Sequence, residues 1–355
     1  MMQWVGLKDR RVLVTGHTGF KGTWLTHWLL QLGAKVCGYA LAPDSTRKHF
    51  TDTDVVSQIE HTEADIRDFE ALNRTMAAFQ PEVVFHLAAQ PLVRLSYREP
   101  RETIETNVQG SVNLMEAVRL CPSVRSLVYV TSDKCYENLE WVWGYRETDR
   151  LGGHDPYSAS KGAAELLFES YRRSFFQERP DLGVASARAG NVIGGGDFAE
   201  DRIVPDAMRA LGTGESIGVR NPIATRPWQH VLEPLSGYLT LACALLECPE
   251  KVSGAWNFGP ESEASRPVSQ LVDAVIQAWG SGSYHDASKP GAVHEAGLLH
   301  LNCDKAHLEL GWRPRWKFDR CIEETVSWYK RAHEGESLAK LTSEQLVNYM
   351  ESSHD

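Results

Sequence analysis

Residues 11–22 read Arg11-Val12-Leu13-Val14-Thr15-Gly16-His17-Thr18-Gly19-Phe20-Lys21-Gly22, and this stretch decides the fold. A short apolar run typical of a strand ends on a glycine, which opens the spacing G-x-x-G-x-x-G. Residues 23–30 continue as a helix. Glycines at such a strand-to-helix turn let backbone N–H groups approach a pyrophosphate at the helix N terminus. The stretch therefore predicts a dinucleotide site, and a purely structural βα turn is the alternative.

The chain repeats this alternation of strands and helices. Apolar runs typical of strands lie at residues 35–41, 83–89 and 126–131, and helical spacing marks residues 104–120. Nearly continuous apolar strands that alternate with helices indicate a parallel sheet covered on both faces. We therefore expect an α/β protein, with a Rossmann-type doubly wound parallel sheet and a smaller mixed α/β substrate domain.

The pattern of the sequence changes after Val192, where three consecutive glycines are followed by shorter expected elements and several prolines. We expect residues 1–192 to form the dinucleotide-binding domain and residues 193–340 to serve mainly substrate binding. Residues 341–355 are expected to form a polar tail that is only marginally ordered at its end.

The composition of the chain excludes several classes of binding partner. The chain has 355 residues with 37 Lys and Arg against 47 Asp and Glu, so its formal net charge is −10. An acidic chain is a poor general binder of nucleic acid or anionic membranes, and no apolar stretch reaches the ~18 residues of a membrane helix. Seven scattered cysteines without a CxxC pair argue against a disulfide framework or a zinc site. We expect a cytoplasmic protein with no metal, nucleic-acid or membrane partner.

The second strand does not settle which dinucleotide is bound. An acidic residue at its end would bind the ribose of NAD, but residues 37–41 carry none and the nearest acid is Asp44. Arg47 and Lys48 can in principle meet the 2′-phosphate of NADP, or they belong to an ordinary solvated loop. The choice between NAD and NADP stays open on these residues.

Tyr157 and Lys161 form a second motif. The Y-x-x-x-K spacing places both side chains on one face of a helix that opens at Pro156. A nearby ammonium favours phenolate over phenol, so Tyr157 can act as a base near neutral pH. Alone, the pair could be a surface Tyr and Lys; its place after a cofactor motif favours catalysis.

Ser132, Asp133 and Lys134 follow the strand at 126–131, and the carboxyl ends of strands are where open α/β sheets bind ligands. Ser132 can hydrogen-bond a substrate hydroxyl. The alternative is that Ser132 and Asp133 serve only as a helix cap or turn.

These motifs together resemble the extended short-chain dehydrogenase/reductase family over about residues 10–330. Within it the chain is most similar to the nucleotide-sugar 4,6-dehydratases, which carry Ser/Thr-Asp-Glu where this chain has Ser132-Asp133-Lys134. The runs at 16–22, 88–94 and 226–231 are similar to members that act on CDP-glucose. The resemblance implies NAD as the cofactor and CDP-glucose as the substrate, whereas spacing alone shows no base preference.

The resemblance also implies roles for single residues. Tyr157 takes the proton of the sugar C4 hydroxyl, Asp133 assists loss of the C6 hydroxyl, and Lys134 occupies the position of the C5 base. A lysine needs a lowered pKa for that task, so polarising the ketone or holding a water stay open for Lys134. The implied cofactor contacts are Gly16, Thr18, Gly19, Phe20, Gly22, Asp65, Ile66, Ala88, Ala89, Tyr157 and Lys161.

The substrate of such an enzyme carries a diphosphate, and Arg binds phosphate in a bidentate manner. We expect Arg226 first, then Arg202 and Arg94, to bind it, and the resemblance adds Asn191 as a nucleotide-sugar contact. Each residue has an ordinary alternative: a surface ion pair for the arginines, a turn for Asn191 and a helix cap for Asp65.

Two rival functions remain. A nucleotide-sugar 4-epimerase would share the glycine motif, Tyr157 and Lys161 but would not need Asp133 and Lys134. A non-catalytic NAD or nucleotide-sugar scaffold would not need the complete Ser132, Tyr157 and Lys161 set. In the resembled family, helices matching 104–120 and 157–177 form a dimer bundle, so we expect a homo-oligomer, either a dimer or a tetramer.

Overall fold

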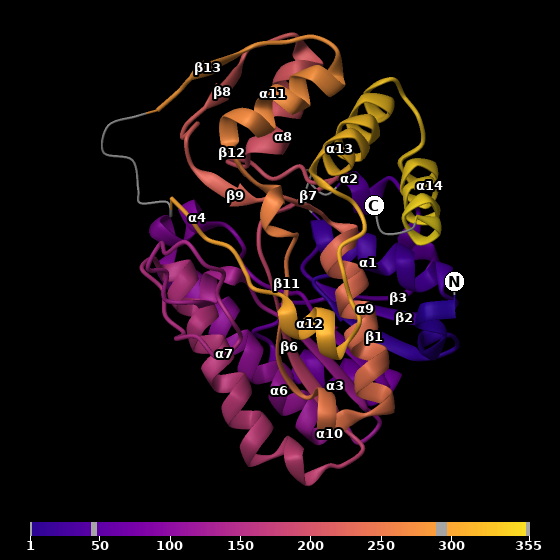
Figure 1. Cartoon of the computed structure of the whole chain (residues 1–355). Helices are drawn as coiled ribbons and strands as arrows, with labels where there is room; N and C mark the ends of the chain where they lie inside the picture. Colours follow the sequence, from indigo (N-terminus) through magenta and orange to yellow (C-terminus); the bar gives the residue numbers. More distant parts are fainter. Residues whose placement is uncertain (1, 44–47, 289–296, 353–355) are drawn as a thin grey trace.

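The computed structural model describes residues 2–43, 48–288 and 297–352. Its centre is a seven-stranded sheet in the order β11-β6-β5-β4-β1-β2-β3, and all neighbouring strands are parallel (Figure 1). The chain builds β2 and β3 on one side of β1 and then crosses to β4 on the other side. This order confirms the predicted doubly wound α/β fold and places a topological switch point between β1 and β4. The strands are β1 Arg11–Thr15, β2 Lys35–Ala40, β3 Glu60–Glu63, β4 Val83–His86, β5 Ser126–Val130, β6 Gly183–Ala189 and β11 Gly254–Phe258.

Both faces of the sheet are buried, because successive side chains of a strand point to opposite faces. Val12 and Val14 of β1 belong to one hydrophobic cluster, and Leu13 between them belongs to the other. Val83 and Phe85 of β4 pack with the first cluster, while Val84 packs with the second. The first face is covered by α1 (Phe20–Gln31) and α9 (Leu232–Glu247), and the second by α3 (Phe69–Phe79), α6 (Gly110–Leu120) and α7 (Pro156–Ser174).

A smaller unit follows the large sheet, and Figure 1 shows it above the carboxyl ends of the strands. It contains three pairs of short strands: β7 with β10, β8 with β13 and β9 with β12. The elements are β7 Val192–Ile193, α8 Ile203–Thr213, β8 Ile217–Val219, β9 Thr225–Pro227, β10 Gln229–His230, β12 Ser265–Pro267, α11 Val268–Trp279, β13 Tyr284–Asp286 and α13 Phe318–His333. The shorter helices of the chain are α2 Lys48–Thr51, α4 Val93–Arg98, α5 Pro100–Ile104, α10 Pro249–Val252 and α12 Asp304–Glu309.

The chain does not divide cleanly at residue 192. Helix α9 packs on the large sheet, and β11 pairs in parallel with β6 as an edge strand. Residues 232–258 therefore complete the first unit, although sequence analysis assigned 193–340 mainly to substrate binding. The helix expected at 104–120 is also interrupted, because residues Glu105–Gln109 form a π-helical turn between α5 and α6.

The expectation of a polar tail from residue 341 is wrong for the part of the tail that the structure describes. Helix α14 (Leu338–Glu351) forms there and buries Leu341, Leu346 and Tyr349. Tyr349 packs edge-on against Trp28 of α1, with ring centroids 5.5 Å apart. The apolar residues of α14 recur at helical spacing, so the helix extends the core that covers the first face of the sheet.

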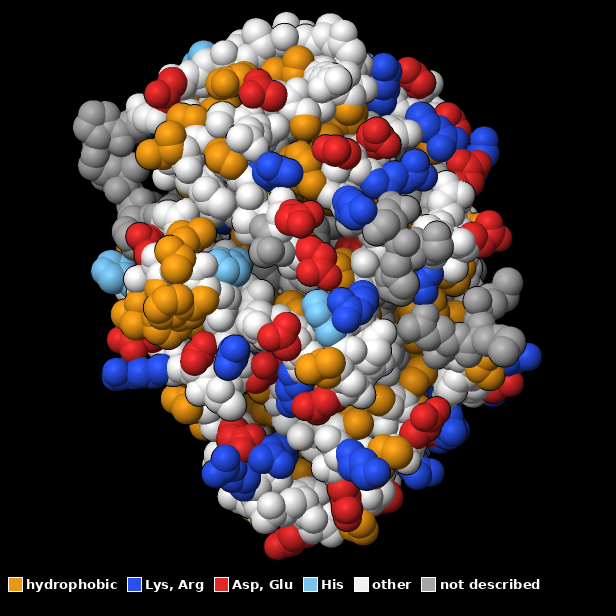
Figure 2. Space-filling view, viewed as in Figure 1, with side chains coloured by type: hydrophobic (Ala, Val, Ile, Leu, Met, Phe, Trp, Pro, Cys, Tyr) orange, Lys and Arg blue, Asp and Glu red, His pale blue; other side chains and the backbone are white. Residues whose placement is uncertain are grey.

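The surface matches the mixed composition. On the face shown in Figure 2, basic and acidic side chains are interspersed. All seven cysteines are free thiols, and Cys248 alone among them is exposed. Among the described residues, no helix combines the length and apolar character that a bilayer span requires.

Truncation of a buried side chain of α14 tests whether this helix belongs to the core. Leu346 is 1% exposed, so Leu346→Ala should lower the free energy of unfolding by about 2–5 kcal/mol. The neighbouring Val347 is 37% exposed, and Val347→Ala serves as the control with an effect below about 1 kcal/mol. Urea denaturation measures both. Equal stability of the two variants would show that α14 does not contribute to the core.

Candidate active site

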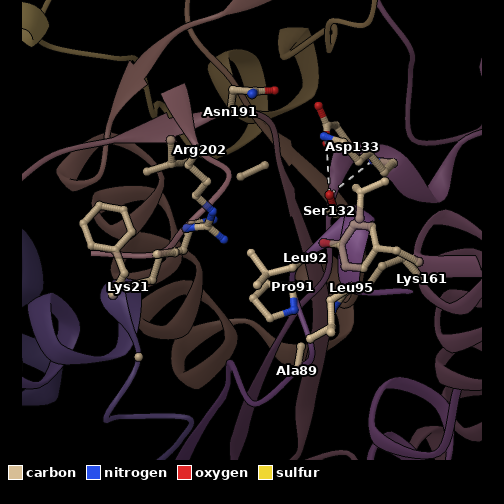
Figure 3. Close-up of a pocket in the computed structure, with 18 of the residues that line it drawn as sticks. Lys21, Ala89, Pro91, Leu92, Leu95, Ser132, Asp133, Lys161, Asn191 and Arg202 are labelled. Carbon is tan, nitrogen blue, oxygen red and sulfur yellow. Dashed lines mark hydrogen bonds and ion pairs between the residues drawn. The ribbon is translucent and has the colours of Figure 1, made fainter. Parts of the chain in front are cut away.

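A cavity of about 1300 Å³ opens at the carboxyl ends of the strands, between the sheet and the smaller unit. Every site residue named from the sequence lines it, including the glycine turn, Asp65, the strand-end residues 132–134 and the four substrate candidates. Figure 3 shows Lys21 and Arg202 on one side of this space, with Ser132 and Lys161 on the other. The topology therefore brings together residues that lie more than 200 positions apart in the chain.

The glycine turn has the close contacts of a dinucleotide cradle. Gly16 has a φ of +75°, and a Cβ at this position would lie 2.7 Å from the backbone nitrogen of Ala88. A Cβ at Gly22 would lie 2.1 Å from the carbonyl oxygen of Gly16. Only glycine fits these two positions without rearrangement of the backbone.

Gly19 is the N-cap of α1 and makes no side-chain capping hydrogen bond to that helix. Thr18 anchors the turn, because its hydroxyl donates to the carbonyl of Leu41 at 3.3 Å. Gly19, Phe20 and Gly22 line the cavity, so the first N–H groups of α1 border it. An uncapped helix N terminus beside a cavity fits an anionic pyrophosphate.

The remaining residues that were predicted to contact the cofactor lie after β3 and β4. Asp65, Ile66, Ala88 and Ala89 line the cavity there. Asp65 does not cap a helix, since Asp68 caps α3 by accepting the N–H of Ala71 at 2.9 Å. Hydrogen bonds from Arg67 lower the pKa of Asp65 and hold its carboxylate ionised. Asp44 and Arg47 lie outside the described residues.

Tyr157 and Lys161 project from the first turns of α7. Asp155 caps this helix by accepting the N–H of Ser158 at 2.9 Å, and Pro156 occupies its first position. The Nζ of Lys161 lies 5.9 Å from the centroid of the Tyr157 ring, and both side chains are buried. The shared helix face that the sequence predicted is confirmed.

The electrostatics of the pair differ from the simple expectation. Burial raises the pKa of Tyr157 to about 12, and the hydroxyl of Ser132 opposes this rise by hydrogen bonding. Burial lowers the pKa of Lys161 to about 8, and the charge of Glu165 opposes that fall. In the protein without ligands, Tyr157 is therefore a neutral phenol at pH 7, so the lysine alone does not make it a base.

Ser132, Asp133 and Lys134 form the turn after β5. Ser132 caps the short 3₁₀ turn Asp133–Cys135 by accepting the N–H of Lys134 at 3.3 Å, so the helix-cap interpretation is also true. Its hydroxyl donates to Asp133 Oδ1 at 3.0 Å. The Nζ of Lys134 lies 3.5 Å from the same oxygen.

The other oxygen of Asp133 is left for a ligand. Asp133 is 1% exposed, and its Oδ2 has no hydrogen-bond partner among the described residues. A Cβ at Gly190 would lie 3.1 Å from this Oδ2, so the glycine keeps space open beside it. A buried carboxyl oxygen without a partner is costly, and a ligand hydroxyl would satisfy it.

The four substrate candidates converge on the same cavity from both units. Arg202 is ion-paired with Asp197 at 2.8 Å, and Arg94 lies 3.8 Å from Asp201. Arg226 donates to the carbonyl of Gly297 at 3.2 Å. The buried Oδ1 of Asn191 has no partner among the described residues, which suits a ligand contact.

Lys21 and Arg220 are two of the cations of the cavity that sequence analysis did not assign to the site. Lys21 lies inside the glycine motif, and desolvation lowers its pKa to about 7 although the charge of Asp133 opposes the shift. Its Nζ donates to the hydroxyl of Tyr238 at 3.4 Å. Arg220 is ion-paired with Asp201. A lysine inside a glycine turn was the available signal for Lys21, whereas the position of Arg220 depends on the fold.

The chain matches a known family model and several known proteins. Residues 12–252 match the model described as the NAD dependent epimerase/dehydratase family. The chain is 47% identical to the CDP-glucose 4,6-dehydratase of Salmonella typhimurium, over 97% of each chain. It is also 30% identical to a dTDP-glucose 4,6-dehydratase of Streptomyces antibioticus, over 90% of this chain and 92% of that protein.

Solved structures show the same fold. A dTDP-glucose 4,6-dehydratase from Bacillus anthracis in complex with NAD superposes with a TM-score of 0.77 at 21% identity, over 92% of this chain and 98% of the other. A UDP-glucose 4-epimerase of Thermus thermophilus, also in complex with NAD, has a TM-score of 0.77 at 26% identity, over 91% and 99%. Dehydratases and epimerases thus share this fold, and the fold alone does not separate them.

A branched side chain at Gly19 tests the cofactor end of the cavity. The backbone there (φ −79°, ψ 170°) suits any residue, so Gly19→Val should fold. Valine adds bulk where the N terminus of α1 borders the cavity, so NAD should bind at least about tenfold more weakly. Calorimetric titration with NAD measures the affinity, and thermal unfolding without ligand is the control. Unchanged NAD affinity in a folded variant would refute this placement.

Proposed function

This chain belongs to the NAD dependent epimerase/dehydratase family, and from that premise we propose that it is a CDP-glucose 4,6-dehydratase. The reaction converts CDP-glucose to CDP-4-keto-6-deoxyglucose and water. The near full-length match at 47% identity supports the substrate, and the carboxyl of Asp133 in the cavity carries the reaction type. Residues 1–192 serve mainly the cofactor, and residues 193–340 mainly the nucleotide sugar.

NAD, when bound, accepts the hydride of C4 and returns it to C6 within one turnover. Tyr157, in its phenolate form, takes the proton of the C4 hydroxyl as the C4 ketone forms. Its high pKa in the free protein means that positive charge must be close when the proton moves, and Lys161 supplies a buried ammonium beside the ring. The hydroxyl of Ser132 opposes the rise in the pKa of Tyr157 and can turn from Asp133 to the phenol oxygen when the proton moves.

Asp133 acts in the second half of the reaction. The C4 ketone makes the C5 proton acidic; a base removes it, and the C6 hydroxyl leaves as water with a proton from Asp133. The carboxyl is suited to this role because it is buried and its Oδ2 is unpartnered within the described residues. The base returns a proton to C5, and the hydride that bound NAD would supply to C6 would complete the 6-deoxy product. A 4-epimerase has no leaving group to protonate and needs no acid here.

Lys134 lies beside Asp133 and borders the same cavity. Its ammonium is 3.5 Å from Asp133 Oδ1, where it stabilises an aspartate that has lost its proton. In this proposal Lys134 restores the charge balance after elimination and also stands at the position of the C5 base. The two tasks need two successive protonation states: the neutral amine of Lys134 accepts the proton of C5, and the ammonium so formed stabilises the aspartate that has given up its proton.

The anionic half of the substrate is bound by Arg226, Arg202 and Arg94, and Asn191 contacts the sugar nucleotide. These residues come from elements of both units, so both units contribute to substrate binding. Because the whole chain carries a net charge of −10, these local cations are what attracts a diphosphate.

We further propose that the protein is a cytoplasmic homo-oligomer. Four large apolar side chains on or beside α5, α6 and α7 are exposed by 41–61%: Ile104, Leu120, Leu166 and Phe175. Exposed apolar side chains on these helices suit contact with a second copy of the chain, as a dimer or tetramer. The seven free thiols suit a reducing compartment.

A substrate panel tests the proposed function. The protein is mixed with NAD and, separately, with the CDP, dTDP, UDP and GDP derivatives of glucose, and a 4-keto-6-deoxy product is sought by mass spectrometry. We expect loss of one water from CDP-glucose, with turnover at least about tenfold faster than for the other nucleotides. An epimerised sugar of unchanged mass would support the epimerase instead, and no product from any compound would support the scaffold.

Replacement of Asp133 separates oxidation from elimination. Asp133→Asn keeps the size of the side chain but removes its transferable proton, so loss of water should slow by about 10²–10⁴-fold. CDP-6-deoxyglucose has no leaving group at C6, and in this variant it should still reduce bound NAD, as stopped-flow absorbance reports. Tyr157→Phe should lose that reduction while NAD still binds. If Asp133→Asn loses it as completely as Tyr157→Phe, Asp133 only positions the sugar.

A further inference from the structure

Glu165 is a buried carboxylate on α7, one turn after Lys161, and the reaction described above does not use it. Its side chain is 2% exposed, and the side chain of its partner Arg188 on β6 is 4% exposed. Arg188 donates to both oxygens of Glu165, at 3.0 Å and 2.7 Å. Ser186 of β6 adds a third donor at 2.8 Å, and the hydroxyl of Thr131 adds a fourth. Four donors on one carboxylate make a fully satisfied buried network.

Stability alone does not explain a charged pair at this place. A buried ion pair is often matched or exceeded in stability by apolar residues of similar volume. Burial works to raise the pKa of Glu165, but Arg188 and the hydroxyl donors outweigh burial and keep it below the usual value. The carboxylate therefore remains charged beneath the active site.

Glu165 reaches the reaction in two ways. Through space, its negative charge supports the ammonium form of Lys161, whose pKa burial lowers to about 8. By a hydrogen bond, it also holds Thr131, the residue that directly precedes Ser132 and Asp133. Arg188 extends the network, because it donates to the hydroxyl of Tyr136 at 2.8 Å, just after the same turn.

We propose that Glu165 is a positioning residue of the dehydratase, which keeps Lys161 cationic and fixes the end of β5 that carries Ser132 and Asp133. The inference rests on the proposed function, since it assigns Lys161 the task of supporting Tyr157 during proton transfer. Without the carboxylate, Lys161 loses its proton at lower pH, and Tyr157 then loses the adjacent positive charge. The loss of the first half-reaction that occurs at high pH should therefore begin at a lower pH than in the native protein.

The electrostatic surroundings of the pair are defined. Glu165 interacts with Arg188 of β6, and its charge also reaches Tyr129 of β5 and Cys135 of the 3₁₀ turn. Lys161 interacts with Cys135 as well as with Glu165, and its own charge reaches His86 of β4 and Lys21 of α1. Burial lowers the pKa of His86 to about 3, so it stays neutral above pH 5, whereas Lys21, with a pKa of about 7, titrates in the same range as Lys161.

The pH dependence of NAD reduction by CDP-6-deoxyglucose tests the proposal on the NAD-loaded protein. In the native protein the rate should fall at high pH as Lys161 loses its proton. In Glu165→Gln the rate should begin to fall at a pH about one unit lower, because the carboxylate one helical turn away no longer favours the ammonium of Lys161. Glu165→Asp keeps the charge, so its limb should stay near the native position even if the rate falls.

Thr131→Val is the matched control, since it removes one donor to Glu165 and no charge. Its high-pH limb should be unchanged, and Lys21→Met should leave the effect of Glu165→Gln in place, which separates the two lysines. If Glu165→Gln does not fold, the double variant Glu165→Gln with Arg188→Met leaves no buried arginine without its partner. Its rate should still begin to fall at a lower pH than that of the native protein. The proposal would be overturned if the rate in either variant began to fall at the same high pH as in the native protein and differed only by a constant factor.

The same data set separates this inference from the proposed function. Native protein that reduces NAD with CDP-6-deoxyglucose and dehydrates CDP-glucose upholds the function whatever Glu165→Gln does. Native protein that does neither removes the function and the inference together. An unmoved limb in an otherwise active enzyme rejects the role of Glu165 alone.

Discussion

All seven strands of the large sheet run in one direction, so their carboxyl ends meet along a single edge, and the site depends on this constraint. The glycine turn after β1, the Ser132 turn after β5 and Asn191 after β6 come from separate parts of the chain. Each contributes one group to the same cavity because each follows a strand. The smaller unit then closes the edge and brings arginines to a space that the sheet alone leaves open.

Electrostatics shape this cavity as strongly as topology does. Desolvation lowers the pKa of Lys21 to about 7 and that of Lys161 to about 8, and burial raises that of Tyr157 to about 12. At pH 7 the protein therefore holds a neutral phenol, a Lys161 that is mostly charged and a Lys21 that is about half charged. An anionic cofactor and a diphosphate would stabilise both lysines in their charged form. Binding and catalysis are coupled through the charge that the ligands bring.

The sequence predicted those parts of the site that are local in the chain. The glycine spacing needs only one turn, and Tyr157 with Lys161 needs only one helix face, so both could be recognised without the fold. The turn at 132–134 followed from its place after a strand. The arginines were named from the chemistry of a diphosphate, and the structure brings all of them to the cavity.

The features that the sequence did not predict depend on contacts between residues that are distant in the chain. Strand β11 pairs with β6, α14 packs on α1, and Arg220 is ion-paired with Asp201. The network of Glu165 combines three elements, and no periodicity in any one of them reveals it.

In the proposed reaction, one hydride leaves C4 of the sugar and returns to C6 of that sugar while water is lost. CDP-glucose carrying deuterium at C4 tests this most directly, with the product examined by nuclear magnetic resonance. We expect a 4-keto product with the deuterium at C6 and, in deuterated solvent, exchange at C5. Deuterium that is found at C4 of an epimerised sugar, or that is absent from C6 of a dehydrated product, would contradict it.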